Sequence, residues 1–181
     1  MTARYPLVLN GTTIQELQAS DTLAGVSPTG DTAVTYTAKQ TFGGSTSSLA
    51  VVLANALERL TISSATAINT INFDIATQSV LYFTTNSTGN FVINARGNSG
   101  ATLTSLMAIG ESTTIVFLNT NGGTAYYPTS FQIDSTTFTV KWSGGTAPSS
   151  GDATAINAYT YTIIKTAASS FTILASIAKF A

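Results

Sequence analysis

The sequence has 181 residues and a mass of 18.7 kDa, the size of one ordinary domain, and its 44% hydrophobic content is enough to form a core. Only 8% of its residues are charged, where about 25% is usual, whereas 33 Thr and 20 Ser supply hydroxyl groups; the formal net charge is −1. The absence of His and Cys excludes Ser–His and Cys–His catalytic pairs, Cys/His zinc sites and disulfides, and seven scattered cations predict no nucleic-acid partner.

The first twenty residues are predicted to form an N-terminal docking arm. Residues 5–9 read as an extended strand, and Asn10-Gly11 is a favoured turn pair. Beyond it, Ile14 and Leu17 are spaced as on one helical turn, or as anchors of an irregular arm. The side chains expected to anchor the arm to a partner are Tyr5, Leu7, Leu9, Ile14 and Leu17. Residues 21–40, rich in Thr, Ser, Gly and Asp, predict an extended linker.

Residues 49–60 are the one helix candidate. Their apolar residues recur with a 3.6-residue period, and Ser47 or Ser48 offers an N-cap. The competing interpretation is a long strand that continues into Thr61 and Ile62, and the sequence does not separate the two. This apolar stretch is shorter than the about 20 residues needed to span a bilayer. We therefore expect a soluble protein, made in the cytoplasm, that does not insert into membranes.

From residue 61 onward the pattern is that of β-strands. Short apolar or alternating runs recur at roughly ten-residue spacing, separated by Gly, Asn and Ser. These runs are residues 68–75, 80–85, 91–95, 114–118, 131–133, 138–142, 159–164 and 171–177. Threonine suits such strands because its methyl group packs on a pleated surface while its hydroxyl faces water. The pattern predicts an all-β fold in which residues 41–181 form an antiparallel β-sandwich of jelly-roll type behind a short extended N-terminal arm.

The low charge also concerns the edges of the predicted sheets. Proteins protect exposed strand edges with Lys, Pro or bulges, and this chain has few of those residues. Weak charge repulsion and unprotected edges favour a protein that associates with its own copies. The alternative is an uncharged monomer.

The carboxylates give no reason to expect an enzyme. Eight are present, and no spacing selects a pair facing a common cleft: Glu16, Asp21, Asp31, Glu58, Asp74, Glu111, Asp134 and Asp152. The Gly-Gly pairs lack the Lys-Ser/Thr that a phosphate loop requires, and no alternating Asp/Asn run suggests a calcium loop. We expect no catalytic residues, no cofactor and no metal. A polysaccharide hydrolase is the one enzyme class kept as a remote alternative.

Three aromatic residues near predicted loops are candidates for ligand binding. Tyr126 and Tyr127 precede a strand, and Trp142 ends one just before Gly144-Gly145. Such residues can stack on the sugar rings of a cell-surface glycan. They are more commonly core or subunit-interface residues.

The sequence resembles small virion structural proteins of tailed phages, particularly those of marine bacteria and cyanobacteria. The resemblance rests on shared segments in a shared order: residues 5–23 (YPLVLNGTTIQELQASDTL), 79–85 (SVLYFTT), 110–117 (GESTTIVF), 124–127 (TAYY), 141–148 (KWSGGTAP), 159–166 (YTYTIIKT) and 173–180 (ILASIAKF). Such proteins are usually described as tail-fibre or surface structural proteins.

The resemblance implies a stable, β-rich module on the virion surface, of a kind that is usually trimeric. The chain has no collagen-like, coiled-coil or triple-repeat shaft. We therefore expect a capsid decoration protein that docks on the major capsid protein by its N-terminal arm and stabilises the shell by binding only the assembled form. The alternative is a tail-fibre or tail-tip protein that contacts tail proteins and host cell-surface glycan.

Overall fold

The computed structural model describes residues 7–10, 13–16, 39–43, 46–47, 51 and 56–181. The chain divides into two compact units, Met1–Leu53 and Ala54–Ala181. The predicted boundaries of the arm and the linker, at residues 20 and 40, both fall within the first unit.

The first unit contains a β-hairpin. Strand β1 (Leu7–Asn10) pairs antiparallel with β2 (Thr13–Glu16), and Leu9 lies opposite Ile14. The alternative of a helical turn at Ile14 is therefore wrong. Of the predicted anchors, Tyr5 and Leu17 lie outside the described residues, as does the predicted linker apart from Lys39 and Gln40.

The helix candidate at residues 49–60 is only partly described. Val51 and residues 56–59 belong to neither a helix nor a strand, and β3 begins at Leu60. The remaining positions, 49–50 and 52–55, lie outside the described residues.

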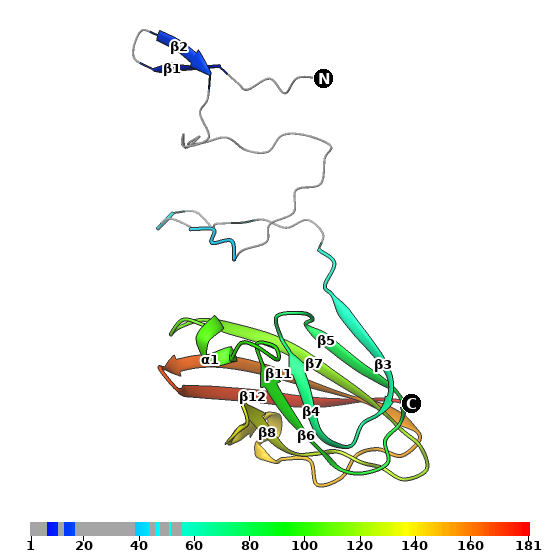
Figure 1. The fold of residues 1–181 in the computed structure, drawn as a ribbon. Helices are drawn as coiled ribbons and strands as arrows, with labels where there is room; N and C mark the ends of the chain where they lie inside the picture. Colours follow the sequence, from blue (N-terminus) through cyan, green and yellow to red (C-terminus); the bar gives the residue numbers. More distant parts are fainter. Residues whose placement is uncertain (1–6, 11–12, 17–38, 44–45, 48–50, 52–55) are drawn as a thin grey trace, which may run out of the picture. The chain divides into compact units, whose positions relative to one another are not determined.

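The second unit is a body of two β-sheets (Figure 1). Its strands in chain order are β3 (Leu60–Thr66), β4 (Asn69–Asp74), β5 (Val80–Asn86), β6 (Phe91–Arg96), β7 (Ser112–Asn121), β8 (Pro128–Ile133), β9 (Thr136–Phe138), β10 (Val140–Trp142), β11 (Ala155–Ala167) and β12 (Ser170–Phe180). A one-turn helix, α1 (Leu103–Leu106), precedes β7, and a 3-10 turn (Ser143–Gly145) follows β10. All eight predicted strand regions contain strand, so the all-β prediction is confirmed.

The strands from β3 to β8 alternate between the two sheets. In the six-stranded sheet, with order β10-β12-β11-β7-β5-β3, the strands β3, β5 and β7 lie parallel. In the four-stranded sheet, with order β4-β6-β8-β9, the strands β4, β6 and β8 are likewise parallel. The chain therefore makes three successive coils, each with one strand in each sheet.

Within the second unit, antiparallel pairing enters only after these coils. The strand β9 folds back on β8, and the long hairpin β11–β12 adds to β7, with β10 pairing parallel to β12 at the edge. The prediction of an antiparallel sandwich is thus corrected to a mixed one, and a jelly roll is not confirmed. Alternating side chains establish a half-buried strand, but they do not encode the direction of its neighbour.

The core lies between the two sheets and is aromatic. Phe91 of the four-stranded sheet meets Phe117 of the six-stranded sheet at 5.2 Å between ring centroids, and Phe131 stacks on Tyr161 at 4.4 Å. All four side chains are almost completely buried. Such burial supplies most of the folding free energy of a body without disulfides.

Helix α1 is held at both ends by charged side chains from other elements. The Asp134 carboxylate accepts hydrogen bonds from the backbone N–H groups of Leu103 and Thr104, at 2.8 and 2.9 Å. At the other end, the buried Lys165 ammonium donates to the carbonyls of Thr104 and Met107, at 2.6 and 2.7 Å. An acid near the N-terminus and a base near the C-terminus satisfy the backbone groups that a helix leaves unpaired.

Candidate functional site: the outer face of the six-stranded sheet

The six-stranded sheet has one face against the core and one face that the described part of the second unit leaves uncovered. On β11, Tyr159, Tyr161 and Ile163 are buried, so the residues between them point outward. The strand registers extend this assignment to the neighbouring strands. The outward residues are Leu60, Ile62, Val80, Tyr82, Ser112, Thr114, Val116, Leu118, Thr120, Lys141, Ile156, Ala158, Thr160, Thr162, Ile164, Thr172, Leu174, Ser176, Ala178 and Phe180. We call this set the outer face.

The outer face is apolar and hydroxyl-rich. Among its residues only Lys141, on the edge strand β10, carries a charge. Several threonine hydroxyls are already satisfied within the face: Thr114 and Thr162 share a hydrogen bond of 3.1 Å, and Thr120 donates to the Phe83 carbonyl at 3.0 Å. Large apolar side chains stay exposed, with Ile62 at 65% and Phe180 at 59%.

The opposite sheet has a polar outer face. Asp74 and Arg96 form an ion pair of 2.6 Å, and the pKa of Arg96 is raised by its hydrogen bond with Asp74. Asn94 donates to Asn72 at 2.8 Å across the adjacent strands. Asn72, Asn94 and Arg96 line a polar hollow of about 450 Å³ that extends to Asp134. The two outer faces therefore differ in kind, and only the four-stranded sheet has a surface of the polarity usual for contact with water.

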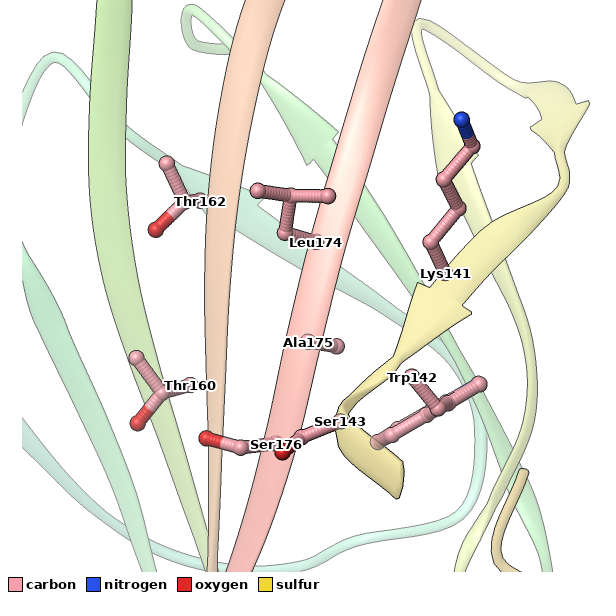
Figure 2. A pocket seen from close by; sticks show the side chains of 8 residues that line it. All are labelled: Lys141, Trp142, Ser143, Thr160, Thr162, Leu174, Ala175 and Ser176. Atoms are coloured by element: carbon pink, nitrogen blue, oxygen red, sulfur yellow. The ribbon is translucent and has the colours of Figure 1, made fainter. Parts of the chain in front are cut away.

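A groove of about 380 Å³ lies at the β10 end of the outer face (Figure 2). Thr160 and Thr162 line one side of it and Lys141 and Trp142 the other, with residues 174–176 of β12 between them. Its open form, an aromatic ring and several hydroxyls could accept a polar ring such as a sugar.

Trp142 is the one predicted stacking residue in this groove. Its indole is half-buried and packs edge-on against Tyr161, at 5.9 Å between ring centroids and an interplanar angle of 70°. It also lines an apolar cavity of about 300 Å³ together with Phe131 and Phe138. Trp142 thus combines a core role with an exposed edge.

Tyr126 and Tyr127 lie in the loop between β7 and β8 and line none of these three hollows. Both are half-buried, and Tyr127 packs against the core. The loop is held by Asn121, whose side chain bonds both the N–H and the carbonyl of Tyr126, at 3.2 and 3.0 Å. The structure therefore does not bring Tyr126, Tyr127 and Trp142 into one site.

A buried polar network lies beneath this loop. Asn121 donates to Asn157 at 3.0 Å, and Asn157 donates to the Asp152 carboxylate at 2.7 Å. Nearby on the sheet, the fully buried Tyr159 hydroxyl has no hydrogen-bond partner among the described residues. Burial, together with the charge of Asp152, raises the pKa of Tyr159 well above its usual value. Burial also raises the pKa of Tyr161.

Each carboxylate whose side chain is described has a hydrogen-bonding or ionic partner. Glu58 accepts from Ser79 at 3.0 Å, and Glu111 accepts from the backbone N–H of Ala108 at 2.8 Å. Asp74 pairs with Arg96, Asp134 caps α1, and Asp152 bonds Asn157. The described side chains include no group of three or more acidic residues placed to hold a metal ion. The predicted absence of catalytic residues stays a prediction.

Comparison with known proteins adds no relative. No family model, no curated protein and no solved structure matches the chain. Within the part of the chain that the structure describes, the helices are all too short to cross a membrane.

The outer face is the feature that sequence reasoning missed. Its residues come from six strands, and their common side follows only from the strand registers. One signal was present: Val80, Tyr82, Val116 and Leu118 are apolar and lie next to buried apolar residues, so β5 and the middle of β7 have apolar side chains on both sides. Such strands are typical of sheets covered on both faces.

Proposed function

We propose that the chain is a non-enzymatic structural protein on the surface of a phage particle, and that it decorates the capsid. In this proposal the N-terminal unit docks on the major capsid protein, and the body associates with its own copies as a trimer. Binding to the assembled shell alone stabilises that shell by mass action.

One observation supports this assignment above the others: a charge-poor two-sheet body follows a separate N-terminal unit that contains its own hairpin. A body of this kind suits permanent contact with other subunits. A hairpin outside the body offers backbone and side chains to a second partner. The resemblance of residues 5–23 and 79–181 to phage virion proteins agrees with this division.

The test uses phage particles that lack the protein. We expect the full chain to co-sediment with them, and a variant without residues 1–20 to remain soluble and stay in the supernatant. Leu9→Asp and Ile14→Asp, at paired positions of the hairpin, should weaken binding at least tenfold, whereas Thr13→Asp serves as the matched control. Equal decoration by the shortened chain would rule out docking through the arm.

A tail-fibre or tail-tip protein is the second candidate, and the groove beside Trp142 favours it. In this alternative the indole stacks on a host glycan while hydroxyls of Thr160 and Ser176 bind its polar groups. Trp142→Ala should then abolish binding to host cells, and immunogold labelling should locate the protein on the tail. Labelling of the head with unchanged adsorption of the Trp142 variant would remove this candidate.

A further inference from the structure

We infer that the outer face of the six-stranded sheet is a self-association surface whose occupant is the same face of a second copy of this chain. The inference deepens the proposed function, because it assigns the contact between copies to particular residues. It begins from the contrast between the two sheets: the face of one carries an ion pair and amide side chains, and the face of the other carries a single lysine at its edge.

The size of the outer face fits one interface. An outward residue occupies roughly 4.8 Å by 6.8 Å of a sheet, so about twenty residues cover about 650 Å² of flat area. Side-chain relief makes the accessible area larger than the flat area. A standard interface takes about 800 Å² from each partner. The outer face is therefore about as large as one interface requires.

The chemistry of the face selects a copy of itself as the partner. It has no row of charges that would recognise a charged protein, and its one ammonium, on Lys141, lies at the edge strand where two packed copies would still leave it in water. Twisted sheets pack face to face at about 10 Å with apolar and β-branched side chains between them. The same face presented twice meets this requirement without like-charge repulsion.

The central rows of the face are particularly suited to such packing. Tyr82, Leu118, Ala158 and Ala178 lie side by side across four strands, and the row is wholly apolar apart from the tyrosine hydroxyl. A two-fold stack buries this row against itself. Three copies around an axis bury it in a common centre. The mass of the assembly in solution will give the number of copies.

The first experiment measures the mass of the full chain by sedimentation velocity and light scattering. We expect three times 18.7 kDa for the proposed trimer, and twice 18.7 kDa would replace the trimer by a dimer that buries the same face. Val116→Lys, in the centre of the outer face, should lower the mass to that of one chain. The matched control is Val92→Lys, a half-buried valine on the outer side of β6 in the other sheet, and it should keep the wild-type mass.

A wild-type monomer, or an oligomer that a folded Val116→Lys variant leaves intact, would overturn the inference. A monomer would assign the face to another protein or to another part of the chain. Circular dichroism shows whether each variant is folded.

A second measurement keeps the inference testable if Val116→Lys does not fold. The chain has no cysteine, so Ala158→Cys and Val92→Cys each introduce the only thiol. The thiol at position 158 should react with a bulky maleimide at least tenfold more slowly at high protein concentration than after dilution, whereas the thiol at position 92 should react equally in both. Equal reactivity at position 158 would contradict the inference.

The two proposals can fail separately. A variant that becomes monomeric and still decorates particles would support the self-association surface and leave docking to the arm. An assembled protein that never binds particles would refute the decoration role and leave the surface in place.

Discussion

Replacing Tyr159 by Phe tests how the body tolerates a polar group in its core. The hydroxyl is completely buried and has no partner among the described residues. An unsatisfied buried polar group costs about 1–3 kcal/mol, and phenylalanine keeps the ring and its packing. Tyr159→Phe is therefore expected to raise the free energy of unfolding at neutral pH by about 1 kcal/mol, in contrast to most core substitutions.

The same substitution should change the response to alkaline pH. Burial raises the pKa of Tyr159 and of Tyr161 in the folded protein, while an unfolded tyrosine titrates near pH 10. A raised pKa stabilises the folded protein at pH values below the pKa of the unfolded tyrosine. This stabilisation is lost as the pH rises toward the pKa of the folded tyrosine. At about pH 11, each buried tyrosine should have lowered the free energy of unfolding by about 1.4 kcal/mol relative to neutral pH. The wild type should lose about twice the amount lost by Tyr159→Phe or by Tyr161→Phe.

The assay is urea unfolding at several values between pH 7.5 and pH 11, at one fixed protein concentration because association adds concentration-dependent stability. Two results would refute the reasoning. One is a Tyr159→Phe protein that is less stable than the wild type by more than about 1 kcal/mol at pH 7.5, which would mean that the hydroxyl makes a favourable contact. The other is a Tyr159→Phe protein that loses as much free energy of unfolding between pH 7.5 and pH 11 as the wild type does.

Three further substitutions test particular contacts, each by the midpoint of urea unfolding. Gly151→Ala places a methyl carbon 2.2 Å from the Tyr126 carbonyl oxygen and should cost about 2 kcal/mol, whereas Gly123→Ala, with open space around it, should change little. Asp134→Ala removes both backbone hydrogen bonds at the start of α1 and should cost about 2 kcal/mol, with Asp134→Asn milder. Asp74→Asn breaks a partly exposed ion pair and should cost less than about 1 kcal/mol; a larger loss would show that solvent screens it poorly.

The positions of the strands could be predicted from the sequence because each is recorded locally. The run at residues 91–95 alternates inward Phe91, Ile93 and Ala95 with outward residues, and β6 spans Phe91–Arg96. The Asn and Gly clusters that follow such runs stop the strands in the expected places. Local chemistry also explains the hairpin of the first unit, where Asn10 ends one strand and Thr13 begins the next.

The pairing of the strands could not be predicted, because it depends on the path of the chain between them. A tight turn would make β3 and β5 antiparallel, but β4 crosses to the other sheet between them and returns the chain in the original direction. Helix α1 was missed for a related reason. A single turn is too short for a periodic pattern, and it persists because Asp134 and Lys165, distant in sequence, hold its ends.

For Trp142, the sequence predicted its position near a loop but not its packing in the body. An aromatic residue beside Gly144-Gly145 was expected near a loop, and Trp142 does lie at the start of the 3-10 turn and in the groove. Its contact with Tyr161 comes from a strand pairing that no local pattern records. Tyr126 and Tyr127 are likewise aromatic residues next to a predicted loop, yet they lie in a different part of the body. Proximity to a loop in the sequence does not specify which loops meet in the fold.

The unusual composition and the inferred assembly have one physical cause in common. A surface lysine or glutamate keeps a monomer soluble, but burying it between copies would require a partner charge and a large desolvation cost. A threonine on a strand presents a methyl group and a hydroxyl, and Thr114 and Thr162 already satisfy each other at 3.1 Å on the outer face. Such a pair loses little when water leaves, since its hydrogen bond is made before the copies meet. A sheet solubilised by hydroxyls can therefore be hydrated in the single chain and buried in the oligomer, which charged side chains at the same positions would prevent.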